Sequence, residues 1–468
     1  MSAGQGRPAA RWLIRGARPL GGAPADILID GQSIARVSAH RPASGGSDAG
    51  QGVTVVDAEG LIALPGLVDL HTHLREPGRE DAETVQSGTA AAALGGFTAV
   101  HAMANTEPVA DTAGVVEQVW RLGRQTGRCD VRPVGAVTTG LGGSQLAELG
   151  AMADSAARVR VFSDDGRCVA DATLMRRALE YVKAFDGVIA QHAQEPRLTA
   201  GAQINEGEVS ARLGLAGWPA VAEEAIIARD CLLAAHVGSA VHVCHVSTAG
   251  SVEIIRWAKS KGWRVTAEVT PHHLLLTDEL AAGYDPVYKV NPPLRTTADV
   301  AALRDGLADG TIDCVATDHA PHPAEYKETE WSHASFGMTG LETALRVVHE
   351  AMVSTGLLDW AAVADRMSAR PAEIGRIGAS STAAPVATGA PAATGSPGAE
   401  DPRHGCPIAA GSPANLVLYD PEPITPVNPA AHASRSRNSP FAGMKLPGQV
   451  VATFLRGRPT VLDGKLTS

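Results

Sequence analysis

The chain has 468 residues, of which 44% are hydrophobic and 19% charged, as in an ordinary soluble globular protein. At this length a single core rarely suffices, so we expect one large domain and one smaller domain. A formal net charge of -10 at pH 7 argues against a general nucleic-acid binder, because such proteins usually carry a basic face.

Neither the N-terminus nor any internal segment has the composition of a targeting or membrane segment. The first residues lack an apolar core of signal-peptide length, and no apolar run approaches the length of a membrane span. The six cysteines form no CxxC pair, and several lie in apolar runs, which favours reduced and buried thiols. We therefore expect a cytoplasmic protein with no membrane partner.

Short strands and tight turns are predicted at both ends of the chain. Near the N-terminus lies "ADILIDGQSIARV", and near the C-terminus lies "VVATFLRGRPTVLDGKL". Each contains an Asp-Gly pair, which is typical of a hairpin turn. Because two strand-rich ends surround a different middle, we expect one small β-sandwich domain assembled from residues 1–65 and 405–468.

Between these ends, apolar strands alternate with helical segments rich in Ala, Leu and Glu, such as 171–185 and 220–236. This alternation indicates an α/β fold with a parallel sheet. Eight such strands over roughly 250 residues are the size of a (β/α)8 TIM-type barrel, which we place at residues 66–370. The alternative is a doubly wound open sheet, but no Gly-rich fingerprint follows the first strand. The strands are predicted at 66–73, 96–105, 131–138, 158–165, 187–193, 241–247, 263–270 and 313–320.

One segment breaks this pattern. From Gly378 to Gly398 every residue except Val386 is Gly, Ala, Ser, Thr or Pro. Such a composition cannot bury enough apolar surface to offset the entropy lost on ordering. We predict a flexible insertion at residues 378–404, between the barrel and the returning β domain.

The stretch "VDLHTHLREPGRE", at residues 68–80, begins in the first barrel strand. In an extended strand, residues two apart share a face, so His71, His73 and Arg75 are expected to point the same way. The His-Thr-His sequence alone does not prove a metal site. The case rests on the ends of the other strands.

Barrel enzymes carry their chemistry at the carboxyl ends of their strands. Each polar residue there has an ordinary explanation by itself, as a histidine satisfied in the core or as an aspartate in a turn or helix cap. Four histidines and two aspartates together supply the donors that zinc prefers, and their number exceeds the need of one tetrahedral zinc. In chain order these ends carry His71, His73, Asn105, Asp165, His192, His245 and Asp318.

Eight motifs support an identification of the family. They are "VDLHTHLREPGRE", "AMANTEPVAD", "FSDDG", "AQHAQE", "VCHVS", "EVTPHHLLL", "VNPPLR" and "ATDHAPH". With them the chain resembles, over nearly its whole length, the dihydroorotases of the amidohydrolase superfamily whose bridging acid is an aspartate. Related hydantoinases bridge their metals with a carboxylated lysine. The "RVRVFSDDG" strand has no lysine, and Lys183, the nearest downstream, lies in a predicted helix, which favours the aspartate-bridged class.

The resemblance implies a set of six metal ligands and two zinc ions. His71, His73 and Asp318 would hold one ion, and His192 and His245 the other. Asp165 would bridge the two, with Asp164 as the alternative bridging residue. Asp318 would also be the catalytic residue that accepts and returns a proton, and each histidine would be neutral, with its second ring nitrogen hydrogen-bonded.

The resemblance also implies a site for the substrate's carboxylate. Arg75 would bind it through paired hydrogen bonds, which lysine cannot reproduce, and Asn105 and His322 would complete the clamp. Asn291 and the backbone of Phe336 and Gly337 would contact the ring. The alternative for Arg75 is a surface ion pair with a neighbouring glutamate. For His272 and His273 we expect a supporting role, and for His101 half-buried packing without a role in the reaction.

The activity implied is the reversible, zinc-dependent hydrolysis of (S)-dihydroorotate to N-carbamoyl-L-aspartate in pyrimidine biosynthesis. The resemblance is compatible with a homodimer and with association with aspartate carbamoyltransferase. One alternative is another metal-dependent cyclic amidohydrolase, such as a hydantoinase or allantoinase, which would not need a carboxylate clamp. Another is a non-catalytic partner of the carbamoyltransferase, but such chains typically lose ligands that this one retains.

Overall fold

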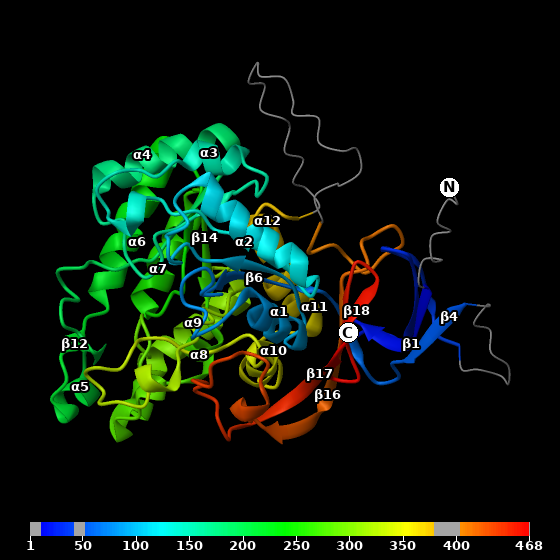
Figure 1. The fold of residues 1–468 in the computed structure, drawn as a ribbon. Helices are drawn as coiled ribbons and strands as arrows, with labels where there is room; N and C mark the ends of the chain where they lie inside the picture. The colour runs from blue at the N-terminus through cyan, green and yellow to red at the C-terminus, as the bar shows by residue number, and fades with distance from the viewer. Residues whose placement is uncertain (1–10, 42–51, 379–402, 468) are drawn as a thin grey trace, which may run out of the picture.

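The computed structural model describes residues 11–41, 52–378 and 403–467. The predicted insertion therefore lies almost entirely outside the described residues. A body of central strands surrounded by helices makes up the larger part of the molecule, and a β sheet lies beside it (Figure 1). In that sheet the red C-terminal strands lie next to the blue N-terminal ones.

The central strands coincide with the eight predicted ones, and all their pairings are parallel. Three form one sheet in the order β6-β7-β8, and five form another in the order β9-β10-β13-β14-β15. Two isolated parallel bridges, Gly135 with Phe162 and Thr72 with His319, connect the two sheets at both ends, so that the eight strands follow one another in a ring. The α/β class is confirmed. The bounds are β6 (Leu67–Thr72), β7 (Phe97–Ala102), β8 (Asp130–Pro133), β9 (Val161–Phe162), β10 (Val188–Gln191), β13 (Val241–Val243), β14 (Val265–Val269) and β15 (Cys314–Val315).

Helices connect these strands, and their ends carry recognisable capping residues. In α7 the Thr248 side chain accepts a hydrogen bond from the N–H of Ser251, and Val252, Ile255 and Ala258 form the buried stripe. The helices are α1 (Val85–Leu94), α2 (Ala113–Thr126), α3 (Leu149–Asp154), α4 (Ala172–Val182), α5 (Glu208–Leu213), α6 (Val221–Val237), α7 (Ala249–Ser260), α8 (Pro271–Leu275), α9 (Thr297–Asp309), α10 (Ala344–Val348), α11 (Trp360–Ala364) and α12 (Arg370–Ile374). A short parallel pair, β11 (Ile204–Asn205) and β12 (Gly217–Trp218), precedes α6.

Strands from both ends of the chain build one nine-stranded sheet. The two halves join where β5 pairs with β1 on one side and with β16 on the other. Its own apolar core combines Ile14, Ile27 and Ile29 with Leu416 and Phe454. The strands are β1 (Arg11–Pro19), β2 (Ala25–Asp30), β3 (Ser33–Ala39), β4 (Val53–Asp57), β5 (Ile62–Pro65), β16 (Leu416–Pro426), β17 (Lys445–Leu455), β18 (Arg458–Leu462) and β19 (Lys465–Leu466).

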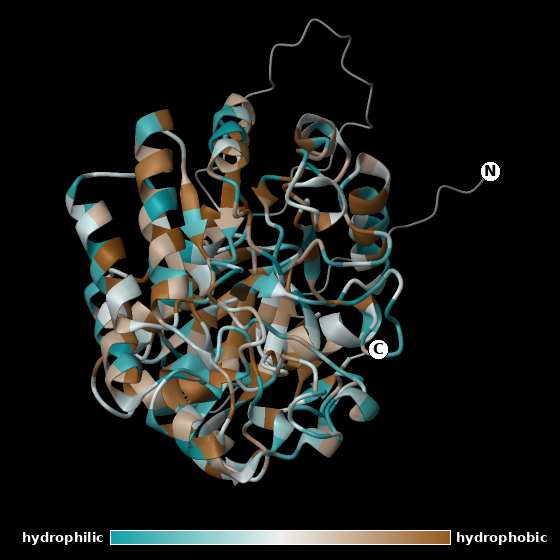
Figure 2. Ribbon diagram, turned by 90° about the vertical axis from the view of Figure 1, so that its left-hand side faces the viewer, coloured by the Kyte–Doolittle hydropathy of each residue, from teal (hydrophilic) through white to brown (hydrophobic). Residues whose placement is uncertain are grey.

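Figure 2 shows hydrophobic residues concentrated on the central strands and polar residues spread over the loops. One large apolar cluster extends from the strands into the surrounding helices and includes Val100, Ile189, Val243, Ile255 and Val269. Burial of this surface is the main favourable contribution to folding. Among the described residues, no helix has the length and apolar character needed to cross a membrane.

The two ends of the chain also meet through their turns, which gives a test of the sheet. Gly457, between β17 and β18, has a φ of +73°, and a Cβ there would lie 1.9 Å from the carbonyl oxygen of Gly31. Gly464, between β18 and β19, has a similar φ of +69°, but a Cβ there would come no closer than 3.8 Å to the oxygen of Val450.

We therefore expect Gly457→Ala to lower the free energy of unfolding by about 2–4 kcal/mol, through left-handed strain plus overpacking. Gly464→Ala carries only the backbone strain and should cost about 1–2 kcal/mol. Denaturant unfolding of both variants measures the difference. Equal losses would mean that the Gly31 turn does not pack against Gly457.

Candidate active site

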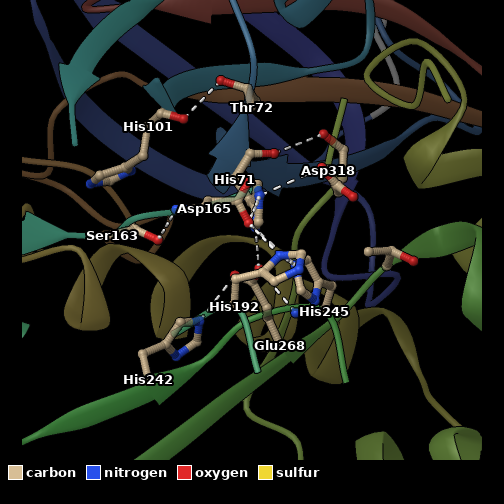
Figure 3. Close-up of polar contacts among 12 residues, drawn as sticks. His71, Thr72, His101, Ser163, Asp165, His192, His242, His245, Glu268 and Asp318 are labelled. Carbon is tan, nitrogen blue, oxygen red and sulfur yellow. Dashed lines mark hydrogen bonds and ion pairs between the residues drawn. The ribbon is translucent and has the colours of Figure 1, made fainter. Parts of the chain in front are cut away.

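Six buried donor residues gather where the central strands end. His71 lies within β6 and His73 directly after it, while the other four follow β9, β10, β13 and β15 within three residues. Each of these residues is at most 5% exposed. Figure 3 shows the Asp165 carboxylate facing the rings of His71, His192 and His245. The six are the predicted His71, His73, Asp165, His192, His245 and Asp318.

The carboxylate of Asp165 lies at the centre of this group. Its Oδ1 is 3.3 Å from Nε2 of His71. The same oxygen is 3.1 Å from Nδ1 of His192 and 3.3 Å from Nε2 of His245. Its other oxygen, Oδ2, lies 3.3 Å from Nε2 of His73. The Asp165 carboxylate thus lies within 3.3 Å of nitrogens from His71 and His73 and also of nitrogens from His192 and His245, which is the position that a bridging ligand would take.

Asp318 approaches the same cluster from the opposite side. Its Oδ1 lies 3.1 Å from Nε2 of His73 and 3.5 Å from Nε2 of His71. Two groups of possible ligands share Asp165: one adds His71 and His73, and the other adds His192 and His245. Within each group the ligand atoms all lie within 4.8 Å of one another. The arrangement could therefore hold two divalent ions, with imidazole and carboxylate ligands of the kind that zinc prefers.

The charges around His71 favour a cation at this place. Burial lowers the pKa of His71, but the carboxylates of Asp165, Asp318 and Glu268 together raise it well above its ordinary value. Nε2 of His71 is buried and has no hydrogen-bond partner among the described residues. The Nε2 position of His71, faced by two carboxylates, therefore favours a positive charge, which a proton or a divalent metal can supply.

Glu268, on β14, fixes the orientation of His71. Its Oε1 accepts a hydrogen bond of 2.7 Å from Nδ1 of His71, and its Oε2 one of 3.0 Å from Nε2 of His242. Because this contact engages Nδ1, Nε2 of His71 is the ring nitrogen that remains to bind a metal, as in the carboxylate–histidine pairs that support metal sites. The sequence reasoning assigned Glu268 no role. A glutamate between Ala267 and Val269 in the predicted strand "WRVTAEVT" was the signal that could have revealed it. The ligand atoms of His71, Cys244 and Glu268 also lie within 4.8 Å of one another.

Two amide side chains orient two of the remaining histidines. Oδ1 of Asn105 lies 2.9 Å from Nδ1 of His73. Oε1 of Gln194 lies 2.8 Å from Nε2 of His192 and 3.1 Å from Nδ2 of Asn291. Since an amide oxygen only accepts hydrogen bonds, these contacts assign the ring protons and leave the opposite nitrogens facing Asp165. Gln194 was not singled out from the sequence, although it belongs to the quoted motif "AQHAQE".

Asp164, the alternative bridging residue, faces away from the histidines. Its Oδ1 accepts hydrogen bonds from the N–H groups of Val137 and Thr138, at 2.8 and 2.9 Å. Its other oxygen accepts one from the Thr138 hydroxyl. Asp164 therefore ties the end of β9 to the segment after β8, and this role differs from that of Asp165.

Arg75 does not continue the strand, contrary to the expectation that it shares a strand face with His71 and His73. β6 ends at Thr72, and Arg75 has a left-handed backbone with a φ of +61°. Its Nε donates to the carbonyl oxygen of Pro321 at 3.2 Å. Burial lowers the pKa of Arg75 to about 10, and the nearby Asp318 partly offsets this. The guanidinium therefore lies beside the cluster, but a turn brings it there.

His322 lies near Arg75, in the segment after β15. Burial lowers the pKa of His322 to about 3, and the charge of Arg75 adds to this effect. Its Nε2 donates a hydrogen bond of 2.8 Å to the carbonyl oxygen of Phe336. Its Nδ1 is buried with no partner among the described residues. The N–H of Gly337 donates to the carbonyl of Lys289.

Three further histidines, to which the sequence analysis gave no ligand role, lie in surroundings that differ from those of the six donors. His273 has both ring nitrogens within hydrogen-bond reach of Thr270 and of the Pro292 and Pro293 carbonyls. Nε2 of His272 is buried without a partner among the described residues. His101 is 2% exposed, so it is buried rather than half-buried as expected, and its Nδ1 lies 3.2 Å from the carbonyl oxygen of Asp69.

The two neighbouring aspartates give a matched test of the bridging position. Asp165→Asn should lower metal content and metal affinity strongly, because the amide cannot supply two anionic oxygens. Asp164→Asn should retain the metal but lower the melting temperature, because it weakens contacts to two backbone N–H groups and a hydroxyl. Metal analysis and thermal melting of both proteins measure these outcomes. Loss of metal in Asp164→Asn but not in Asp165→Asn would mean that Asp164, and not Asp165, is the bridging residue.

A family model described as "Dihydro-orotase-like" matches residues 60–251. The dihydroorotase of Streptomyces coelicolor is 66% identical to this chain over 458 residues, which are 98% of this chain and 100% of the relative. The dihydroorotase of Mycobacterium tuberculosis is 53% identical over 455 residues, which are 97% of this chain and 99% of the relative.

Two solved structures share the fold. The L-hydantoinase (dihydropyrimidinase) from Arthrobacter aurescens superposes with a TM-score of 0.80 and 25% identity, covering 98% of this chain and 97% of that one. For the dihydropyrimidinase from Brevibacillus agri the TM-score is 0.76 and the identity 22%, with 98% and 96% covered. The fold is thus that of the hydantoinases, whereas the sequence follows the dihydroorotases. The chain belongs to the dihydroorotase family of metal-dependent cyclic amidohydrolases.

Proposed function

We propose that this chain hydrolyses the cyclic amide of (S)-dihydroorotate to N-carbamoyl-L-aspartate, and closes the ring in the biosynthetic direction. The observation that carries the proposal is the Asp165 carboxylate among four histidines, with the Arg75 guanidinium beside them. A hydantoinase-type site would need a lysine at the bridging position. Nζ of Lys183 instead donates to the carbonyl of Val237, at 2.9 Å.

We propose two zinc ions as the cofactors. His71, His73 and Asp318 would hold one, His192 and His245 the other, and Asp165 both. When bound, the ions lower the pKa of a shared water and polarise the ring carbonyl. Glu268, Asn105 and Gln194 each bond the outer ring nitrogen of one histidine, namely His71, His73 and His192, so that the other nitrogen of each ring points inward.

Asp318 is the proton carrier in this proposal. Burial would raise its pKa, but His71 and His73 lower it to about 2, so its carboxylate is ionised at neutral pH. An ionised carboxylate at the reacting centre can accept the proton of the attacking water. It then delivers that proton to the ring nitrogen as the amide bond breaks, and the same steps run backward in ring closure.

The carboxylate of the substrate would lie against Arg75. A guanidinium pairs with a planar carboxylate through two parallel hydrogen bonds. His322 lies near Arg75 with a buried Nδ1 that has no partner in the described part of the chain, and Oδ1 of Asn105 lies 2.9 Å from Nδ1 of His73. Asn291, tied to Gln194, and the Phe336–Gly337 backbone would line the place of the ring.

The finer points of architecture are proposals as well. We infer that the ring of eight strands is a (β/α)8 barrel at residues 66–370, and that the nine-stranded sheet is the β-sandwich of residues 1–65 and 405–468. The parallel bridge between β6 and the segment after β15, with the one between the segment after β8 and β9, supports closure. Six free cysteines agree with the expected cytoplasmic location. The homodimer, the carbamoyltransferase association and the cytoplasmic location stay predictions.

The purified protein should contain about two zinc ions per chain and should turn over dihydroorotate about 100-fold or more faster than hydantoin or allantoin. The reason is that only dihydroorotate has a carboxylate for the clamp. Metal analysis and parallel assays of the three substrates test this. Preference for hydantoin or allantoin, or a protein active without metal, would refute the proposal.

Arg75→Ala should lower kcat/KM for dihydroorotate by about 100-fold, since a charge-assisted hydrogen-bond pair is lost. Arg79→Ala is the matched control. Arg79 lies four residues further along the same loop, and its Nε is 3.6 Å from Asp81 on the surface. The control should retain kcat/KM within about twofold, because exposed ion pairs contribute little. Equal kinetics of the two variants would remove Arg75 from the site.

A further inference from the structure

The carbonyl oxygen of Gly337 is held by two side chains from distant parts of the sequence. Nζ of Lys327 donates to it at 3.0 Å, and Nδ2 of Asn438 donates to it at 3.2 Å. The N–H of the same residue donates to the carbonyl of Lys289 at 3.0 Å. Both backbone polar groups of Gly337, a residue proposed to line the substrate site, are thus fixed by other residues.

Lys327 is a buried cation, only 6% exposed. Its Nζ donates to three carbonyl oxygens, those of Lys289, Ser335 and Gly337, at 3.1, 2.9 and 3.0 Å. Burying an ammonium group is costly unless its hydrogens are all bonded, and here three donors meet three acceptors. These contacts join the segment after β15 to Lys289, which lies two residues before Asn291.

Asn438 approaches from the other body of the molecule, on the connection between β16 and β17 of the terminal sheet. Its Oδ1 accepts from the N–H of His322 at 3.2 Å. Its Nδ2 donates to the carbonyls of Ala320 and Gly337 at 3.0 and 3.2 Å. Its own carbonyl accepts from the N–H of Thr339 at 3.1 Å. One amide therefore fastens both ends of the segment 320–338.

The held segment includes the residues proposed to meet the substrate. Nε2 of His322 donates to the carbonyl of Phe336 at 2.8 Å, so the two ends of the segment are also tied to each other. A shift of the Gly337 peptide would therefore displace Phe336 and with it His322. Neither Lys327 nor Asn438 needs to touch the substrate to influence how it binds.

We propose that Lys327 and Asn438 are positioning residues that act through the Gly337 carbonyl to hold His322 and Phe336–Gly337 in the shape that binds dihydroorotate. This inference rests on the proposed function. It assigns to the terminal sheet, through Asn438, a part in substrate recognition. Five of the six proposed metal ligands lie on other segments and Asp318 precedes this one, so the effect should concern substrate binding more than the chemical step.

Kinetics of substituted proteins test the inference. Lys327→Met removes the three donors at similar length, and Asn438→Asp replaces two donors by an oxygen that repels the carbonyls. Each should raise KM for dihydroorotate about tenfold while kcat falls less than about threefold and zinc content is unchanged. In the double variant KM should rise much less than the product of the single effects, since both residues act on one carbonyl.

Two control variants separate positioning from general destabilisation. Lys259→Met removes a lysine that donates to the Gly310 carbonyl and to Asp313, at 3.1 and 2.6 Å, away from the segment. Asn428→Asp changes an exposed asparagine on the same β16–β17 connection, whose Oδ1 accepts from the N–H of Ala430. Both controls should keep the wild-type KM, even if Lys259→Met lowers the melting temperature.

An unchanged KM in folded Lys327→Met and Asn438→Asp, or a purely multiplicative double effect, would overturn the inference. A lower melting temperature with the wild-type KM would also overturn it, because that is the signature of a purely structural role. If Lys327→Met does not fold, the KM of Asn438→Asp alone decides the matter: a raised KM supports the inference, and the wild-type KM overturns it. Failure of the wild-type protein to turn over dihydroorotate would instead refute the proposed function, and this inference with it.

Discussion

The rest of the site depends on one constraint, the burial of the Asp165 and Asp318 carboxylates among four imidazole rings. Buried carboxylates are costly unless a positive charge or a hydrogen-bond donor faces them, so the inward ring nitrogens must either carry a proton or bind a cation. Glu268, Asn105 and Gln194 accept the outer ring protons of three histidines and thereby fix which nitrogen of each ring faces the carboxylates. The strand ends also carry backbone strain, with φ values of +32° at His245 and +46° at Asp318. Such strain persists where the surrounding packing over-determines the conformation.

The two bodies of the molecule are connected through this region as well as through their sheets. The buried Glu83 carboxylate, just before α1, accepts from the N–H of Arg435 at 3.0 Å and lies 3.3 Å from Nε2 of His319. His319 follows the proposed proton carrier, and its carbonyl accepts from the N–H of His73 at 2.8 Å. With Asn438 this makes a second connection from the terminal sheet to the strand ends. A sheet that the sequence suggests as a separate domain therefore contributes to the conformation of the site.

Patterns that depend on neighbours in sequence predicted much of this structure. Apolar runs separated by amphipathic helices gave all eight central strands, and Asp-Gly pairs marked the terminal hairpins. The six donors could be found because parallel strands bring their carboxyl ends together. The hydrogen-bond partners of Glu268 and Asn438 could not be predicted, because these bonds join positions 197 and 116 residues apart and no local pattern encodes them. The prediction that Arg75 shares a strand face with His71 and His73 was wrong, because sequence patterns do not predict a left-handed backbone for a residue other than glycine.

That left-handed turn bears on how one short stretch can serve both the proposed metals and the proposed substrate. Had the strand continued, Arg75 would have stood on the face of His71 and His73, where its charge would compete with a divalent ion for Asp165 and Asp318. The turn and the hydrogen bond to Pro321 hold the guanidinium beside the carboxylates instead. From there it lowers the pKa of His73, after the larger effect of burial, which favours the neutral ring that a metal needs. The cation that would select the substrate thus also helps to keep a ligand unprotonated.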